Sequence, residues 1–246
     1  MSAKSIVFAG LFSSFALGAC AKEDVSCTEI DYKDLPFTVC NAASGLDLRL
    51  FLRNNADEIF GDFDAINAEL KNTDNRLVFA MNAGMYHQDR RPVGLYIEDG
   101  VEFAKLNTNP GPGNFHLLPN GVFWIGQDGT GVTSANDFDA KDVTYATQSG
   151  PMLVIDGQLH PAFREKSTSL RIRNGVGQTA DGHIYFVKSE LPVNFHIFAS
   201  LFLEELETPN ALFLDGTVSK LYSGALKRND KGAQMGPILG LVAPIP

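Results

Sequence analysis

Residues 79–100 read FAMNAGMYHQDRRPVGLYIEDG, and the interpretation of the whole sequence depends on this stretch. The apolar run that enters it is typical of a buried β-strand, and a second apolar run leaves it before a turn. Between the two runs, Asn82 and Gly84 tolerate unusual backbone angles, and six polar-tipped residues follow, beginning with Tyr86 and His87. We therefore predict a strand, a functional loop and a strand, with these four residues as site candidates. A solvated hairpin loop is the alternative.

Residues 148–151, QSGP, form a second candidate stretch. Gln148 and Ser149 end an apolar strand at a glycine break, which places an amide and a hydroxyl where backbone N–H groups are also available. An ordinary polar turn is the alternative. We do not expect Ser149 to act as a nucleophile, because the G-x-S-x-G elbow is absent and the sequence places no histidine as its base.

Two arginines indicate an anion site in a chain that is otherwise acidic. Arg171 and Arg173 lie two residues apart in a predicted strand, so they would point from the same face. A guanidinium group binds phosphate or carboxylate oxygens through two parallel hydrogen bonds. With Asn174 beside them, these arginines are candidate substrate ligands. Surface arginines paired with nearby acids are the alternative.

The sharpest chemical feature is the acid in residues 211–216, ALFLDG. Asp215 follows a wholly apolar run, and a carboxylate at the end of a buried strand is costly unless it is hydrogen-bonded or used. Asp215 is therefore our first candidate for a catalytic group, with Gly216 beside it in the site. The aspartate of a simple Asp-Gly turn is the alternative.

The composition favours one globular domain. The 246 residues are 44% hydrophobic and 20% charged, which is enough to bury a substantial core. The 29 acidic and 20 basic residues give a net charge of -9, which argues against nucleic acid as a partner. Any anion that binds must therefore meet a local cationic pocket.

The histidines do not predict a metal centre. His87 lies in the central loop and His116 follows a Gly-Pro-Gly turn, whereas the other three look structural or exposed. No two histidines have the i, i+4 spacing of a helical metal site, and no cysteine and histidine spacing indicates zinc. We predict no metal site and no cofactor, and the sequence leaves dependence on a divalent metal open.

The first residues predict export. Lys4 precedes an apolar run that ends in small residues, as in a secretory signal peptide, and the run is too short to span a bilayer by itself. Residues 17–20, LGAC, look like the lipobox of bacterial lipoproteins. We therefore predict a signal peptide over residues 1–19 and a lipid on Cys20 that anchors the protein to the bacterial envelope on the periplasmic side. Ordinary cleavage near this site, giving an unanchored exported protein, is the alternative.

The three cysteines agree with this prediction. Lipidation of Cys20 would leave Cys27 and Cys40 to form a disulfide in an oxidising compartment. A bridge that closes a loop of this size contributes roughly 3 kcal/mol to the free energy of unfolding. We expect residues 20–26 to be a short linker and residues 27–246 to form one domain.

The rest of the sequence predicts many short strands and two helices. Residues 62–71 and 194–208 have helical periodicity, and Asp62 is a suitable N-cap for the first of them. Residues 37–40 and 46–53 are expected to form a first strand pair. Further strands are predicted at residues 77–81, 115–118, 122–125, 143–149, 152–155, 169–173, 183–189, 211–214 and 238–242. The predicted fold class is α+β, a single domain with a mixed, mainly antiparallel sheet and two packed helices.

The candidate stretches, in this order, resemble the motifs of the phosphodiester glycosidase family. Residues 82–86 match its Asn-Gly-Gly-aromatic-aromatic segment, and residues 148–151 match its Gln-x-Gly-Pro. Residues 173–177 match its Arg-x-x-x-Gly region, and residues 214–216 match its Leu-Asp-Gly-Gly. The resemblance covers roughly residues 27–243 and points to a bacterial exported branch of the family.

Two departures from the family pattern concern the substrate-facing loop. Residues 217–220, TVSK, replace a run of glycine and serine, and Ala83 stands where glycine is usual. The β-branched Val218 restricts backbone angles that glycine would allow. We expect these departures to affect the identity of the substrate more than the type of reaction.

The resemblance implies an exported hydrolase that cuts between a sugar C1 and a phosphodiester oxygen of a carbohydrate substrate. Asp215 would stabilise the oxocarbenium ion or activate water, while Arg171 or Arg173 would bind phosphate. Asn82, Gln148 and Asn174 would orient sugar hydroxyls. Tyr86 or His87 would line the sugar site or assist proton transfer. The altered residues near Asp215 motivate a second hypothesis, a non-catalytic envelope lipoprotein that binds glycan phosphodiesters. Cleavage of phosphate-free glycosidic bonds is a third.

Overall fold

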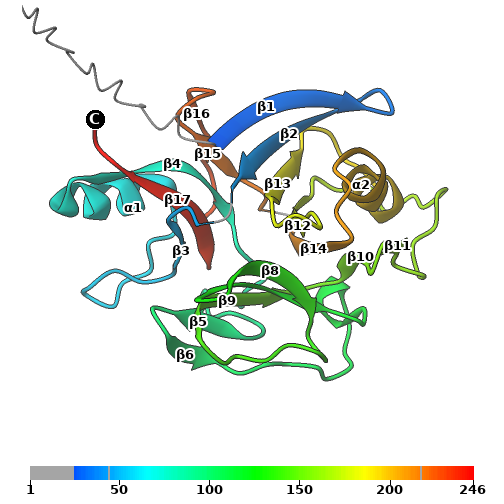
Figure 1. Ribbon diagram of the computed structural model, residues 1–246, viewed down its shortest axis with the longest axis horizontal. Coiled ribbons are helices and arrows are strands. Elements are labelled where there is room, and N and C mark those ends of the chain that lie inside the picture. Colours follow the sequence, from blue (N-terminus) through cyan, green and yellow to red (C-terminus); the bar gives the residue numbers. More distant parts are fainter. Residues whose placement is uncertain (1–24, 44, 217) are drawn as a thin grey trace, which may run out of the picture.

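Three antiparallel sheets dominate the computed structural model, which describes residues 25–43, 45–216 and 218–246 (Figure 1). The first sheet has seven strands in the order β1 (Val25–Tyr32), β2 (Leu35–Ala42), β13 (Ile184–Ser189), β12 (Asn174–Gln178), β14 (Asn210–Asp215), β10 (Met152–Ile155) and β11 (Gln158–Leu159). The second has five, in the order β16 (Arg228–Asn229), β15 (Leu221–Ser223), β4 (Asn75–Asn82), β17 (Ile238–Pro244) and β3 (Leu48–Phe51). The third has five, in the order β6 (Val101–Ala104), β5 (Tyr96–Glu98), β9 (Val143–Ser149), β7 (Gly121–Gly126) and β8 (Gly129–Ser134).

The two predicted helices are present and are short. Helix α1 (Phe63–Leu70) is capped by Asp62, whose side chain accepts a hydrogen bond from the Ala65 N–H, and the 3₁₀ turn η1 (Lys71–Thr73) follows it. Helix α2 (Phe195–Ser200) is capped in the same way by Asn194 and continues as the π-turn η3 (Leu201–Glu205). Residues 115–118 were expected to be a strand, but the chain there enters the 3₁₀ turn η2 (Asn114–His116).

The prediction of a single sheet is wrong, because the described strands form three sheets, whereas the expectation of mainly antiparallel pairing is confirmed. Most predicted strands are present, but those at residues 115–118 and 169–173 are not, and one predicted pairing fails. Strand β2 pairs with β1, and β3 pairs with β17. The β1–β2 turn consists of Lys33 and Asp34 with φ values of 51° and 60°, a conformation that glycine or asparagine usually signals. Since neither residue is present, the sequence carries no hairpin signal there.

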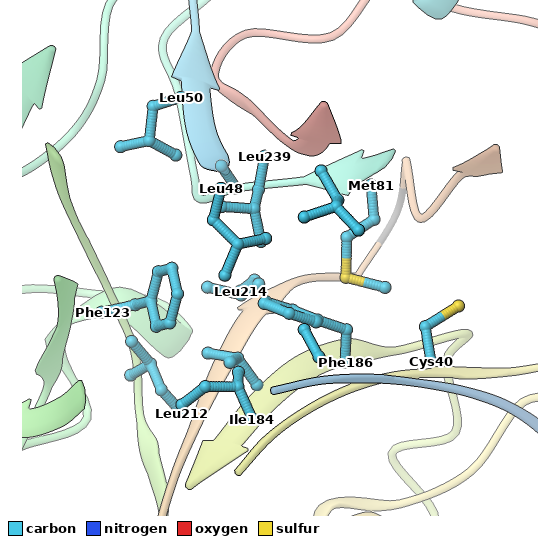
Figure 2. Close-up of a cluster of buried hydrophobic side chains, with 14 of the residues drawn as sticks. Cys40, Leu48, Leu50, Met81, Phe123, Ile184, Phe186, Leu212, Leu214 and Leu239 are labelled. Carbon is cyan, nitrogen blue, oxygen red and sulfur yellow. The ribbon is translucent and has the colours of Figure 1, made fainter. Parts of the chain in front are cut away.

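The three sheets meet at one apolar cluster. Figure 2 shows side chains from all three sheets facing one another. Met81 and Leu239 come from the second sheet, Phe186 and Leu214 from the first, and Phe123 from the third; all five are at most 1% exposed. Packing of this kind fixes the ends of the strands relative to one another.

The helices cover the outer faces of two sheets. The predicted apolar stripe of α1, Phe63, Ile66 and Leu70, is buried against the second sheet. Phe198 and Phe202 of the α2 segment are buried against the first sheet, as expected from their spacing. Figure 1 shows α1 beside β4 and β17, and α2 against the first sheet.

A charged network joins the first sheet to the second. Arg228 binds Glu190 through Nη1 at 2.6 Å and Asp230 through Nε at 2.9 Å, and Lys188 Nζ lies 3.1 Å from Glu190. Thr38 also donates to Glu190, at 2.7 Å. Burial alone would raise the pKa of Glu190, but these partners lower it to about 2. The carboxylate therefore stabilises the folded state.

The predicted disulfide is present between Cys27 and Cys40, which face each other across β1 and β2. Its position ties the outermost strand of the first sheet to its neighbour. Cys20, the predicted lipidation site, lies outside the described residues.

Candidate active site

The candidate site lies where three strand ends meet, one from each sheet. Asn82 ends β4 of the second sheet, Ser149 ends β9 of the third and Asp215 ends β14 of the first. Side-chain hydrogen bonds link them, since Asn82 Nδ2 donates to Asp215 Oδ2 at 3.3 Å and Ser149 Oγ donates to the Leu214 carbonyl at 2.7 Å. Residues far apart in the sequence thus meet at the junction of the sheets.

Asp215 is the ionisable group at this junction. Its Oδ1 accepts a hydrogen bond from the Gly216 N–H at 2.6 Å, in addition to the bond from Asn82. Burial raises the pKa of Asp215 to about 6, although these two hydrogen bonds lower it. The apolar strand that brings Asp215 to the junction is fully buried, as the sequence predicts. The carboxyl therefore titrates near neutral pH.

Two asparagines position Asp215 and use their amide groups for that purpose. Asn174 Oδ1 accepts from the Asp215 N–H at 2.7 Å, and Asn174 Nδ2 donates to the Asn82 carbonyl at 3.2 Å. Asn82 Oδ1 accepts from the Lys220 N–H at 2.7 Å. Both asparagine side chains are fully buried. This network orients the carboxyl from two sheets at once.

Asp215 faces a cleft of about 440 Å³. The cleft lies between the loop after β4, the turn η2 and the segment after β14, and its walls are Met85, Tyr86, Val93, Pro112, Gly113, Asn114, Phe115, His116, Asp215 and Val218. Its size is in the range of small-ligand sites. Val218, one of the departures from the family pattern, therefore contacts the space that a substrate would occupy.

Tyr86 is an aromatic wall of this cleft, and the Arg90 guanidinium packs on its ring without lining the cleft itself. Burial raises the pKa of the Tyr86 phenol, the charge of Asp215 raises it further, and Arg90 lowers it. The Arg90 guanidinium lies 5.3 Å from the centre of the Tyr86 ring. Among the described residues no carboxylate pairs with Arg90; its Nη1 donates to the Gln88 carbonyl at 3.1 Å, and its Nε is buried without a hydrogen-bond partner. Sequence reasoning did not single out Arg90, whose φ of 70° has no clear sequence signal.

The histidine that lines the cleft is His116, and His87 is exposed outside its walls. His116 Nδ1 lies 2.8 Å from the Asn109 carbonyl, which can accept its proton and leave Nε2 for chemistry. A Cβ added to Gly111 would lie 2.7 Å from the His116 ring, so this glycine allows the loop to pack on the imidazole. The Gly-Pro-Gly turn before His116 was the available sequence signal.

Gln148 and Gly84 support the loops around the cleft. Gln148 Oε1 accepts from the Leu95 N–H at 2.9 Å and the Asn107 N–H at 2.8 Å, and its Nε2 donates to the Asn107 carbonyl at 2.7 Å. A Cβ on Gly84 would lie 2.9 Å from Thr147 Oγ1, so glycine is required for this close approach. The structure thus brings both residues to the site region, where they hold the backbone.

The expectation that Arg171 and Arg173 share one face of a strand is wrong. Residues 169–173 are not a strand; Arg171 makes only an isolated bridge to Val193 and is exposed, whereas Arg173 is 1% exposed. The Arg173 guanidinium stacks on Phe195 at 3.6 Å, and burial lowers its pKa to about 10. Neither arginine is among the residues that line the cleft. Aromatic contacts across elements decide this geometry, and residue spacing does not reveal them.

The described residues contain no group of three or more His, Cys, Asp or Glu side chains arranged to hold a metal ion. None of their helices is long and apolar enough to cross a membrane.

A buried carboxyl of raised pKa that faces a cleft is the kind of group that acts in glycosidases. The family model for phosphodiester glycosidases matches residues 75–240, more than half of the chain. The chain therefore belongs to the phosphodiester glycosidase family, as its motifs suggested. The uncharacterized protein YigE of Escherichia coli (strain K12) is 34% identical over 215 residues, which cover 86% of this chain and 82% of YigE.

Solved structures share the fold at low sequence identity. The catalytic domain of zebrafish N-acetylglucosamine-1-phosphodiester alpha-N-acetylglucosaminidase, auto-inhibited by its pro-peptide, aligns with a TM-score of 0.61 at 14% identity, over 91% of this chain and 84% of that one. A putative exported protein from Burkholderia pseudomallei K96243 aligns with a TM-score of 0.56 at 12% identity, over 84% and 74% of the two chains. At these identities the likeness concerns the fold.

Proposed function

We propose that this protein is an exported glycosidase that hydrolyses the bond between a sugar C1 and a phosphodiester oxygen in a glycan. The observation that carries the proposal is the position of Asp215, which ends a buried strand, faces the cleft and is held by amides from two sheets. Membership of the family supports the reaction type. The name of the zebrafish structural relative supports a sugar-1-phosphodiester as the substrate class.

The charge state of Asp215 suits this reaction. With a pKa of about 6, the carboxyl is mostly ionised at neutral pH and can stabilise an oxocarbenium ion or activate water. Among the described residues that line the cleft, it is the only carboxyl. Glycosidases usually use a second carboxyl to protonate the leaving group. A phosphate monoester has a second pKa of about 6, so it leaves with little help from an acid.

We assign phosphate binding to Arg90, which packs on the Tyr86 wall of the cleft although it does not line the cleft, and proton transfer to His116. Arg90 has guanidinium N–H groups to spare beside Tyr86, and His116 lines the cleft with Nε2 free of the Asn109 contact. The Arg90 guanidinium would stabilise a negative leaving group, and His116 Nε2 would exchange protons with water or substrate. Arg171 and Arg173 remain predicted phosphate ligands from the family motif, but their positions support that role less well.

The reaction balances as a simple hydrolysis. The C1–O bond breaks, its electron pair leaves with the phosphate monoester, and water supplies the hydroxyl at C1. The proton that water loses goes to Asp215 or His116 and then to the phosphate product or solvent. The products are a reducing sugar and a phosphate monoester.

The reaction is tested by incubating purified protein with a panel of glycosyl-1-phosphodiesters in ¹⁸O-labelled water, with and without chelator. We expect release of reducing sugar, with the label in the C1 hydroxyl. Label in the phosphate product would indicate attack at phosphorus and contradict the proposal. Binding without turnover of any member of the panel would favour the non-catalytic alternative, and equal cleavage of phosphate-free glycosides would favour an ordinary glycosidase.

We also propose export and lipid anchoring through Cys20. The disulfide between Cys27 and Cys40 supports an oxidising compartment, and the bacterial structural relative is described as a putative exported protein. The mature protein is expected to begin at an acylated Cys20 and to enter the detergent phase on partitioning. A Cys20→Ala variant that stays equally membrane-bound would contradict the anchor.

A further inference from the structure

A second hollow of about 440 Å³ borders the loop after β4 at Arg91 and Pro92. One wall is the loop after β3, with Arg53, Asn54 and Asn55; the opposite wall carries Glu98 from β5 and Phe103 from β6. The volume is in the range of small-ligand sites. None of the residues assigned to the catalytic cleft lines it.

The charges in this hollow are balanced. Arg53 lies 3.5 Å from Asp57, and Arg91 Nε lies 2.6 Å from Asp89. With Glu98 as a further acid in the lining, the two arginines provide no excess positive charge for phosphate. Each guanidinium fork still has N–H groups beyond those that contact its carboxylate, so both can donate to a neutral polar ligand.

Local hydrogen bonds order the polar wall of the hollow. Asn54 Oδ1 accepts from the Ala56 and Glu58 N–H groups, both at 2.9 Å, and Arg53 Nη1 donates to the Asp57 carbonyl at 2.6 Å. These bonds fold residues 53–58 into a fixed loop. A preformed set of donors loses little freedom when it binds a ligand.

The opposite wall presents an aromatic ring to solvent. Phe103 is 62% exposed on the edge strand β6, and its ring lies 6.4 Å from that of the buried Tyr96. Leu52 and Pro92 extend the apolar surface next to it. A pyranose ring has this combination of faces, because its C–H face packs on an aromatic ring while its hydroxyl rim requires donors and acceptors.

Glu98 supplies an acceptor at the base of the hollow. Its Oε2 accepts a hydrogen bond from the Tyr96 hydroxyl at 2.7 Å, which fixes the carboxyl. Burial raises the pKa of Glu98 to about 7, although the Tyr96 hydroxyl lowers it and Asp99 raises it further. The carboxyl accepts hydrogen bonds when it is ionised and can also donate one when it is protonated.

Two adjacent residues of the chain line the hollow and the catalytic cleft. Pro92 lines the hollow and Val93 lines the cleft. The loop between them is held by a bridge between Tyr86 and Pro92 and by the bond from the Val93 N–H to the Met85 carbonyl at 3.1 Å. Both sites therefore border the same segment, and a ligand that occupies both would cross it.

We propose that the hollow lined by Arg53, Glu98 and Phe103 binds a neutral sugar ring, as a second carbohydrate site beside the catalytic cleft. The proposal that this ring belongs to the same glycan as the cleaved bond rests on the proposed function. The second site would then select extended glycan phosphodiesters over single-sugar substrates.

Binding is tested first, without reference to catalysis. The mature protein is titrated with maltotriose, cellotriose, chitotriose and inorganic phosphate, while amide resonances are followed by NMR. We expect at least one trisaccharide to shift the signals of Phe103 and Arg53, and phosphate to leave them unchanged. Phe103→Ala should weaken this binding about tenfold, whereas Val101→Ala, which alters an exposed apolar residue of the same strand outside the hollow, should not.

The binding site is overturned if no trisaccharide shifts these signals at about 20 mM, or if Phe103→Ala binds as Val101→Ala does. Kinetics then test the link to catalysis, using a single-sugar phosphodiester and the same compound extended by two hexoses. Phe103→Ala should raise KM about tenfold for the extended substrate only. An unchanged KM would overturn the link while the binding site stands. If the parent protein cleaves neither substrate, the proposed function fails, and the titration still decides the second site.

Discussion

Replacing Asn82 by aspartate tests how strongly the junction of the sheets controls Asp215. Asn82 Nδ2 donates to Asp215 Oδ2 at 3.3 Å, while Asn82 Oδ1 accepts from the Lys220 N–H at 2.7 Å. Asn82→Asp keeps the acceptor for Lys220 and the shape of the side chain. It replaces the donor that faces Asp215 with a carboxylate oxygen.

The size of the effect follows from the distance. Two unit charges 3.3 Å apart interact with about 5 kcal/mol at an effective dielectric constant of ~20, equivalent to between roughly three and four pKa units. Relaxation and sharing of one proton reduce this value, so we expect the higher apparent pKa of the pair to rise by at least about one unit above that of Asp215 in the parent. A base or nucleophile that must be ionised would then lose activity at pH 7 and recover it at higher pH.

The assay is a ¹³C NMR titration of the aspartate carboxyl carbons, together with the pH profile of kcat/KM on a verified substrate. Asn75→Asp is the matched control, because it adds the same charge at the opposite end of the same strand. The reasoning is refuted if Asn82→Asp leaves the carboxyl titration of Asp215 where the control leaves it.

Three further predictions concern stability and support of the site. The pKa of Glu190 is about 2 in the folded protein, below its ordinary value of 4.5, so its contribution to the free energy of unfolding is present above about pH 4.5 and is lost as the pH falls toward 2. In Glu190→Gln, the loss of stability between pH 4.5 and pH 2 should be smaller by about 1–3 kcal/mol in denaturant titrations. The same loss of stability in the variant and the parent would be evidence against this role. Joint replacement of Cys27 and Cys40 by serine should lower the free energy of unfolding by roughly 3 kcal/mol, and peptide mapping that finds two free thiols in the oxidised parent would refute the bridge. Gln148→Ala should release the segment around Asn107 and lower kcat/KM at least tenfold, with unfolding measured alongside; full activity would exclude this supporting role.

Much of the local structure could be predicted from the sequence. The cap at Asp62, the start of the second helix at Asn194, the strand that ends in Asp215 and the break after Ser149 follow from side-chain chemistry and short periodicities. These signals depend on neighbours in the chain. They therefore locate elements without showing which strands pair.

The arrangement of the site could be predicted only in part. Asn82, Asn174 and Asp215 do meet, as the ordered family motifs implied. The position of His116 depends on how residues 107–116 fold back on Gln148, and the burial of Arg173 depends on an aromatic ring from another element. Contacts of this kind arise from tertiary packing and leave no periodic trace in the sequence.

The central claim is tested most directly by the turnover of Asp215→Asn on a verified glycosyl phosphodiester. Asn keeps the shape of the side chain and removes its charge, so we expect kcat to fall by about 10² to 10⁴ while the protein stays at least as stable, because the parent buries an ionised group with a pKa of about 6. The matched control is Asp156→Asn, which alters an exposed Asp-Gly turn after β10 in the same sheet and should leave kcat unchanged. Turnover of Asp215→Asn within a few-fold of the parent would contradict the assignment of Asp215 as the catalytic group.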